Sequence, residues 1–180
     1  LDLPQGARVL DLCCGAGASA LEAARRVGER GRVVAVDVSS RLLEHARRRA
    51  AREGLSNLDF VLSDATRLDV ADATFDAVVC VFGVFFAADR PSFVDEMRRL
   101  TKPGGRVALT TWGPHLFEPA NSIFWDAVGV LRPDLRRSFN PWDDLVTPDD
   151  VAALFDENDF HPPHVELIEG VHHLTGPQGF

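Results

Sequence analysis

The chain has 180 residues, 46% of them apolar and 26% charged, and its 19 basic and 27 acidic residues give a net charge of −8. This size and composition are typical of one soluble globular domain with its own hydrophobic core. The acidic balance disfavours a nucleic-acid partner and an anionic membrane surface. The longest apolar run, 77–88, is too short to cross a bilayer, so we expect no membrane span.

Apolar runs with strand character alternate with amphipathic stretches along most of the chain. This pattern predicts an α/β fold with a mostly parallel central sheet and helices on both faces. The predicted strands are Arg8–Leu12, Arg32–Asp37, Leu58–Leu62, Phe75–Phe82 and Arg106–Trp112. The predicted helices between them are Ser19–Val27, Arg41–Arg52 and Pro91–Leu100.

Local signals support these helices. Ser19 and Glu22 have the spacing of a capping box, and Ser39 or Ser40 is a candidate cap for the second helix. Beyond Trp112 the alternation loosens, with a helix predicted at 121–131, another that begins with a Thr147 cap, and a last strand at about His164–Leu174. We expect one domain over 1–180, with a cofactor-binding half at 1–112 and an acceptor-side half at 113–180.

The three cysteines are Cys13, Cys14 and Cys80. Two of them are adjacent, so they form no disulfide framework, and a reducing, cytoplasmic location fits best. Adjacent cysteines also chelate metals poorly, and no second pair exists to complete four ligands. We therefore expect no metal site and assign these residues to packing.

A glycine turn follows the first strand and opens the first helix. In an open α/β sheet this strand–turn–helix context binds a nucleotide-like ligand at the carboxyl ends of the strands. Gly15 and Gly17 allow the backbone to approach the ligand closely. Asp37 ends the second strand, where its carboxylate can accept both hydroxyl protons of a ribose.

The turn has two interpretations. Gly15, Gly17 and Ala20 match the dinucleotide fingerprint, which would indicate an NAD(P)-dependent oxidoreductase. Asp11, however, lies four residues before Gly15, at the mouth of the turn. A carboxylate there would disfavour an anionic pyrophosphate and would favour a cationic ligand without phosphate. S-adenosylmethionine, which carries an ammonium and a sulfonium group, is such a ligand.

These residues resemble the class I S-adenosylmethionine-dependent methyltransferases, whose first motif reads acidic-x-Gly-x-Gly-x-Gly. The segment from Asp11 to Gly17 matches it with Cys13 in place of the first glycine, an exchange that requires Cys13 to hold the same backbone angle. Further motifs match in order over about 8–112, at 34–39, 62–65, 75–82 and 99–106. The chain is most similar to the broad ubiquinone/menaquinone C-methylase-like group.

The resemblance implies a Rossmann-like methyltransferase fold, whose seventh strand this chain would lack. It also implies ribose contact by Asp37, adenine contact by Val38, acceptance of the adenine amino group by Asp64 and donation by the Ala65 amide. A structural interpretation stays open for each aspartate, as a helix cap or turn residue. The residues predicted to bind the cofactor are Asp11, Cys13, Gly15, Gly17, Asp37, Val38, Asp64, Ala65, Val81 and Phe82.

The resulting hypothesis is methyl transfer from S-adenosylmethionine to a small, apolar or aromatic acceptor. Phe82, Phe85, Trp112 and Trp142 are candidates to roof the acceptor pocket, and His115 is a candidate general base three residues after Trp112. The alternatives are the NAD(P)-dependent oxidoreductase and a non-catalytic domain that binds S-adenosylmethionine. The sequence leaves the oligomeric state and the acceptor open.

Overall fold

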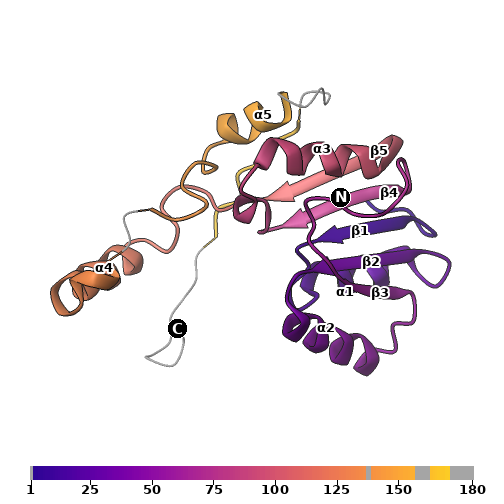
Figure 1. Ribbon diagram of the computed structural model, residues 1–180, viewed down its shortest axis with the longest axis horizontal. Helices are drawn as coiled ribbons and strands as arrows, with labels where there is room; N and C mark the ends of the chain where they lie inside the picture. Colours follow the sequence, from indigo (N-terminus) through magenta and orange to yellow (C-terminus); the bar gives the residue numbers. More distant parts are fainter. Residues whose placement is uncertain (1, 137–138, 157–162, 171–180) are drawn as a thin grey trace.

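The computed structural model describes residues 2–136, 139–156 and 163–170. Its centre is a sheet of five parallel strands in the order β3-β2-β1-β4-β5 (Figure 1). The strands are β1 (Arg8–Leu12), β2 (Arg32–Asp37), β3 (Leu58–Leu62), β4 (Phe75–Val81) and β5 (Thr101–Thr110). The helices are α1 (Ala18–Val27), α2 (Ser40–Arg52), α3 (Arg90–Leu100), α4 (Ala120–Leu131) and α5 (Pro148–Asp156), with short 3-10 turns η1 (Val84–Phe86) and η2 (Pro133–Leu135).

Helices cover both faces of the sheet, as predicted, because successive strand residues point to opposite sides. Val9 and Val33 belong to one core, which they share with α1 and with Leu43 of α2. Leu10 and Val78 belong to the other core, which they share with α3 and α5. The α/β fold class is therefore confirmed.

Side-chain caps fix most helix starts. The Ser39 hydroxyl accepts the Leu42 amide at 3.3 Å, and the Thr147 hydroxyl accepts the Asp150 amide at 3.2 Å. The capping box predicted for α1 is wrong. Gly17, with φ +81°, precedes that helix, and the Ser19 hydroxyl donates instead to the buried carboxylate of Asp11.

The fifth strand differs from its predicted bounds at both ends. It begins at Thr101, before the Pro-Gly-Gly turn, because the chain pairs with β4 at Phe75, bulges out, and resumes pairing between Ala77 and Arg106. Such a bulge adds residues to one strand without ending the pairing. The strand ends at Thr110, so Trp112 lies in the loop that follows it.

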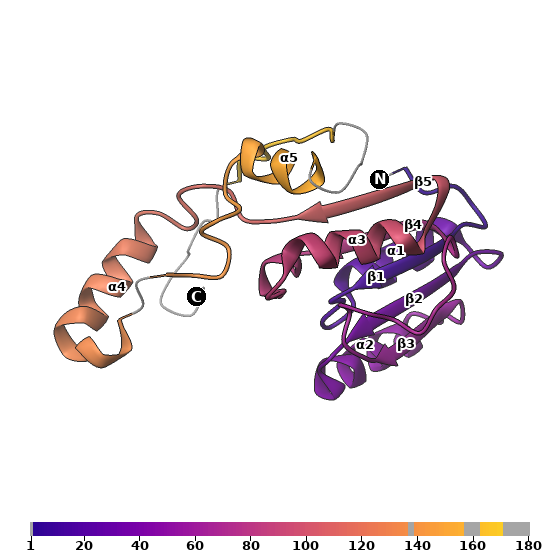
Figure 2. The same cartoon turned by 45° about the horizontal axis from the view of Figure 1, so that its top comes forward.

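The described residues beyond Trp112 depart further from the prediction. The strand predicted at 164–174 is wrong over 164–170, which form no strand, and 171–174 lie outside the described residues. Helix α4 projects away from the sheet in both views (Figures 1 and 2) and has no buried residue. Among the described residues, no helix combines the length and apolar character that a membrane crossing needs.

A buried ion pair anchors the loop between β3 and β4. The carboxylate of Glu96, on α3, is 4% exposed, accepts the Leu68 amide at 2.8 Å and pairs with Arg99 at 2.7 Å. Arg99 also donates to the carbonyl groups of Val70 and Leu68. Burial alone would raise the pKa of Glu96, but the bonds from Arg99 and Leu68 outweigh it and lower the pKa.

We expect Glu96→Ala to lower the free energy of unfolding by about 3 kcal/mol, because it leaves the Arg99 charge without its buried partner. Urea unfolding measures the change. Because the folded-state pKa of Glu96 is lowered, this stabilisation is present above the unfolded-state pKa and is lost as pH falls through the folded-state value. Asp95→Ala, which breaks the exposed Asp95–Arg98 pair on the same helix, is the control and should cost under about 1 kcal/mol. Equal losses of stability in the two variants would contradict the stabilising role of the Glu96–Arg99 pair.

Candidate cofactor site

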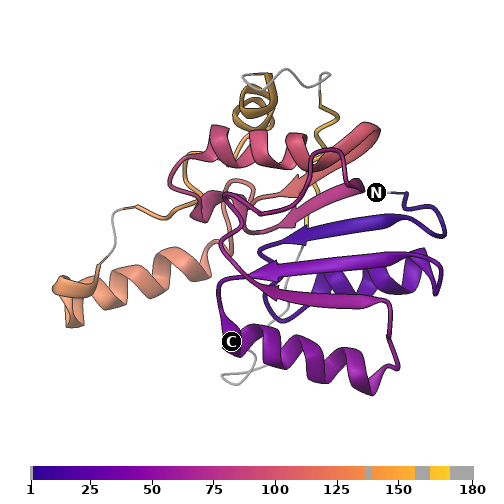
Figure 3. The same cartoon turned by 45° about the vertical axis from the view of Figure 1, so that its right-hand side comes forward.

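The site lies where the strand order reverses. The chain builds β2 and β3 on one side of β1 and then crosses to build β4 and β5 on the other. All strands point toward one edge, as their arrowheads show in Figure 3. In open α/β sheets this reversal leaves a crevice outside the carboxyl ends of the strands, where ligands bind. The predicted cofactor residues lie in the last positions of β1, β2 and β4 or in the loops that follow β1 to β4 at this edge.

The turn after β1 has the left-handed backbone that its sequence predicts. Cys13 has φ +56° and Gly15 has φ +54°, so Cys13 does hold the angle required at the position of the first motif glycine. A Cβ on Gly15 would meet no atom within 4 Å, which leaves that side of the turn open to a ligand. A Cβ on Gly17 would lie 2.7 Å from Leu21 and 2.9 Å from Ala46, so Gly17 also permits close packing of α1 on α2.

The carboxylate of Asp37 ties this turn to the end of β2. One oxygen accepts the Gly15 amide at 2.8 Å, and the other accepts the Ser39 amide at 2.8 Å. The side chain is largely buried, and each oxygen keeps a second lone pair for a further donor. Asp37 can therefore shape the glycine turn and accept two hydroxyl groups at once. The spacing of these residues is visible in the sequence, but the bond to Gly15 is not.

Asp11 lies beneath the turn and not at an open mouth as predicted. Its side chain is fully buried, and one oxygen accepts the Ser19 hydroxyl at 2.6 Å. The other oxygen has no hydrogen-bond partner among the described residues. Burial raises the pKa of Asp11 to about 7, and the negative charge of Asp37 adds to this rise, whereas the Ser19 bond opposes it.

The loops after β2 and β3 place the predicted adenine contacts beside Asp37. Val38 is 70% exposed, and Asp64 is exposed, with one oxygen accepting the Thr66 amide at 2.8 Å. That bond lowers the pKa of Asp64. The Ala65 side chain is buried in the core, while the Ser63 amide donates to the Asp37 carbonyl at 3.2 Å and joins the two loops.

Aromatic side chains lie beyond β4 and β5. The ring of Phe82 stacks on Trp112, with centroids 4.0 Å apart, and Trp112 lies 6.0 Å from Phe117. Phe82 is 37% exposed and has φ +54°. Its backbone N–H donates to two acceptors of Thr110, the carbonyl oxygen and the hydroxyl oxygen. Sequence reasoning missed Thr110, because only strand pairing brings it to Phe82.

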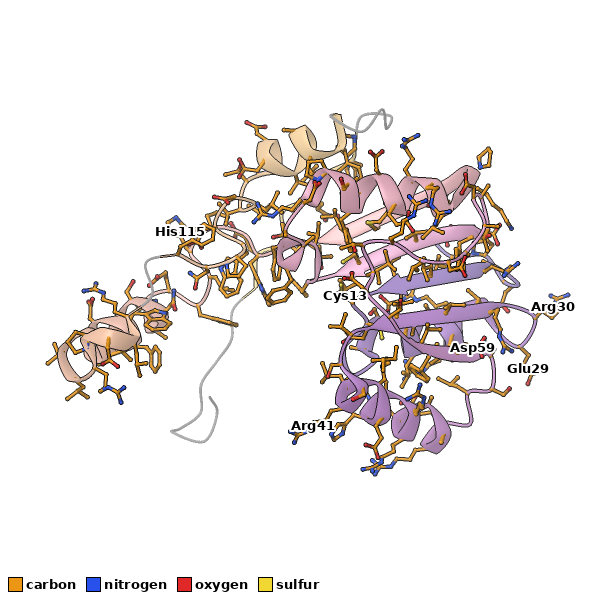
Figure 4. The ribbon with its side chains drawn as sticks, in the orientation of Figure 1. Cys13, Glu29, Arg30, Arg41, Asp59 and His115 are labelled. Atoms are coloured by element: carbon orange, nitrogen blue, oxygen red, sulfur yellow. The ribbon has the colours of Figure 1, made fainter. Side chains whose placement is uncertain are left out.

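Two predicted pocket residues lie elsewhere. Phe85 is buried in the core, where its ring meets Trp142 edge-on at 5.7 Å, so we correct its expected role as a roof residue. His115 is exposed with φ +62°. Figure 4 shows it on the loop that leads to α4, well separated from Cys13.

The charges of the site fit a cationic ligand. The carboxylates of Asp11, Asp37 and Asp64 each act to raise the pKa of Cys13, because their negative charges disfavour its thiolate. A pyrophosphate would be repelled here, whereas an ammonium and a sulfonium group would be attracted. With Asp37 free to accept hydroxyl groups, the described residues suit S-adenosylmethionine better than a dinucleotide.

Comparison with known proteins supports this assignment. A family described as a methyltransferase domain matches residues 9–105. The chain is 36% identical over 121 residues to the ubiquinone/menaquinone biosynthesis C-methyltransferase UbiE of Haemophilus ducreyi, covering 67% of this chain and 47% of that protein. It is 40% identical over 109 residues to the 2-phytyl-1,4-naphtoquinone methyltransferase of Thermosynechococcus vestitus, covering 61% of this chain and 48% of that protein.

The chain thus spans about half the length of these curated relatives. Among solved structures it is similar to a SAM-dependent methyltransferase from Aquifex aeolicus, with a TM-score of 0.60 and 26% identity over 73% of this chain and 72% of that one. The family match favours S-adenosylmethionine as the cofactor over the dinucleotide alternative. This chain belongs to the methyltransferase-domain family and has the fold of the class I S-adenosylmethionine-dependent methyltransferases.

Proposed function

We propose that the protein transfers a methyl group from S-adenosylmethionine to a small acceptor with an aromatic or quinone-like ring. The observation that carries this proposal is the placement of two features at one sheet edge. The Asp37–Gly15 unit offers acceptors for the ribose, and the stacked Phe82–Trp112 pair offers an apolar surface beside it. The relatives named as quinone methyltransferases support the choice of an aromatic ring.

The bound cofactor supplies the methyl group on a sulfonium, and the protein supplies alignment and water exclusion. In this proposal Asp37 fixes the ribose, and Val38 and Asp64 contact the adenine. The Ala65 amide donates to the adenine ring. Phe82 and Trp112 hold the acceptor, because flat aromatic faces stack on one another.

His115 is a proposed general base, needed only for an acceptor that carries a removable proton. Its exposed position on the loop before α4 would require this loop to approach the turn. The cytoplasmic location predicted from the cysteines also stays a prediction.

Asp37→Ala should weaken S-adenosylhomocysteine binding by about 1.5–3 kcal/mol, since it removes charged hydrogen bonds to the ribose. Titration calorimetry of the full-length protein measures the loss. Because Asp37 also holds the Gly15 amide, the same titration with a 2′-deoxyribose analogue is needed. The wild type should prefer the ribose ligand, and the variant should not. If both proteins preferred the ribose ligand over the 2′-deoxyribose analogue to the same extent, Asp37 would hold the glycine turn without contacting the ribose.

The affinity for S-adenosylmethionine should rise as pH increases from 5.5 to 7.5. The pKa of Asp11 is raised to about 7, so its attractive carboxylate form gains population over this range. The rise cannot exceed about tenfold per pH unit, the limit for one released proton. Asp11→Asn should flatten the profile. An unchanged slope in this variant would show that another group causes it.

Trp112→Ala should raise KM for an aromatic acceptor, with little change in S-adenosylhomocysteine affinity, because the ring is placed on the acceptor side of the site. Transfer of labelled methyl from S-adenosylmethionine to quinone-like compounds by the full-length protein measures this. Trp125→Ala, on the projecting helix α4, is the matched control and should leave KM unchanged. Equal KM values for all three proteins would contradict the acceptor assignment. Cofactor binding with no labelled product from any acceptor would support the non-catalytic alternative.

A further inference from the structure

The thiols of Cys13 and Cys80 meet at the carboxyl ends of β1 and β4. Leu12 pairs with Cys80 in the strand register, and Cys13 is the next residue along β1. Both sulfurs crowd Gly83, since a Cβ there would lie 3.1 Å from the Cys13 Sγ and 2.8 Å from the Cys80 Sγ. The two thiols therefore lie on the same side of Gly83.

Both cysteines are free thiols, so forming an S–S bond of about 2.05 Å requires the turn at Cys13 to close toward β4. Disulfides join Cα atoms about 4.4–6.8 Å apart, and Cys13 directly follows Leu12, the register partner of Cys80 on the neighbouring strand. Cys14 is oriented differently, because it packs into the opposite core with Ala20 and Ala23. Cys13 and Cys80 therefore form a specific pair, and the adjacent cysteine is outside it.

The two members of the pair have different chemical environments. Cys13 is partly exposed, and the hydrogen bond from Cys80 lowers its pKa even though burial and the carboxylates of Asp37, Asp11 and Asp64 oppose this. Cys80 is fully buried, and the bond with Cys13 and burial both raise its pKa. The thiolate is the reactive form, so Cys13 is the member that meets a reagent from solvent.

We propose that Cys13 and Cys80 are a peroxide-reactive dithiol site whose disulfide form binds the cofactor weakly. The Cys13 thiolate attacks one oxygen of hydrogen peroxide, the O–O bond breaks, and hydroxide leaves to become water. The resulting sulfenic acid is attacked by the Cys80 sulfur, which loses its proton as the S–S bond forms and the sulfenic oxygen leaves as water. Two thiols are oxidised, and one peroxide is reduced to two waters.

The position of Cys13 in the glycine turn explains why the disulfide should lower the affinity for the cofactor. Cys13 begins the left-handed turn that brings the Gly15 amide to Asp37, so a covalent bond to Cys80 constrains the turn at its first residue. The inference uses the cofactor assignment made above. Linkage is reciprocal, so a ligand that binds the reduced form more tightly must also shift the thiol–disulfide equilibrium toward the reduced form.

The test treats the full-length protein with hydrogen peroxide and then titrates S-adenosylhomocysteine by calorimetry. We expect intact mass to fall by two hydrogen atoms, and peptide mapping to join Cys13 to Cys80. Affinity should fall by about 5- to 150-fold, the usual range for coupled sites, and dithiothreitol should restore it. In a glutathione redox buffer, saturating S-adenosylhomocysteine should shift the thiol–disulfide equilibrium toward the reduced protein.

Cysteine variants separate this site from general oxidation. Cys14→Ala should still form the disulfide and lose affinity, whereas Cys80→Ala and Cys80→Ser should form no crosslink, with folding checked by circular dichroism. A wild type that forms no Cys13–Cys80 crosslink would overturn the proposal, and so would a crosslinked protein with unchanged affinity. Failure of the reduced protein to bind S-adenosylhomocysteine would instead contradict the cofactor site. The mass measurement would still show whether the Cys13–Cys80 disulfide forms.

Discussion

The cofactor site at the carboxyl ends of the strands depends on one buried carboxylate. Asp37 accepts the Gly15 amide and the Ser39 amide, so a single side chain joins the turn after β1 to the start of α2. Together with the bond from the Cys14 amide to the Val36 carbonyl at 3.0 Å, these bonds hold the turn against β2, while a Cβ on Gly15 would meet no atom within 4 Å. The interaction makes the turn rigid while leaving lone pairs for a ligand. Two parallel strands thus share one preorganised site.

The same edge holds an unusual concentration of negative charge. Asp11 lies buried below the turn with one oxygen unpaired among the described residues, and the charge of Asp37 acts on it. Desolvation makes the charge of Asp11 costly, which is why its pKa is raised to about 7. A cationic ligand would offset part of that cost. The charge that would weaken a phosphate site thus favours the cofactor of this family.

The two halves of the chain differ in how they are held. In 1–112 helices pack on both faces of β1, β2 and β4, and the Glu96–Arg99 pair of α3 holds the loop between β3 and β4. Beyond residue 112, α4 projects from the sheet and exposes Ile123 and Val130. Phe82 and Trp112 lie at the boundary between these regions, where a rigid cofactor edge meets an open apolar surface.

The sequence by itself determined the strand positions, the helix faces and the glycine turn, because alternating apolar residues and turn residues act over a few positions along the chain. It also predicted the positive φ of Cys13 through the motif glycine that this residue replaces. It did not predict the extent of β5, because pairing with β4 carries that strand through a Pro-Gly-Gly segment that would end an isolated one.

Only the tertiary structure decided which groups meet. The Ser19 signal for a helix cap was overridden by the buried Asp11 carboxylate, since an unpaired charge in the core recruits the nearest hydroxyl. The bond from Gly15 to Asp37, the Thr110 contact with Phe82 and the Cys13–Cys80 pair all join residues from different strands. Such contacts depend on strand order and register, which the local pattern of apolar and polar residues does not encode.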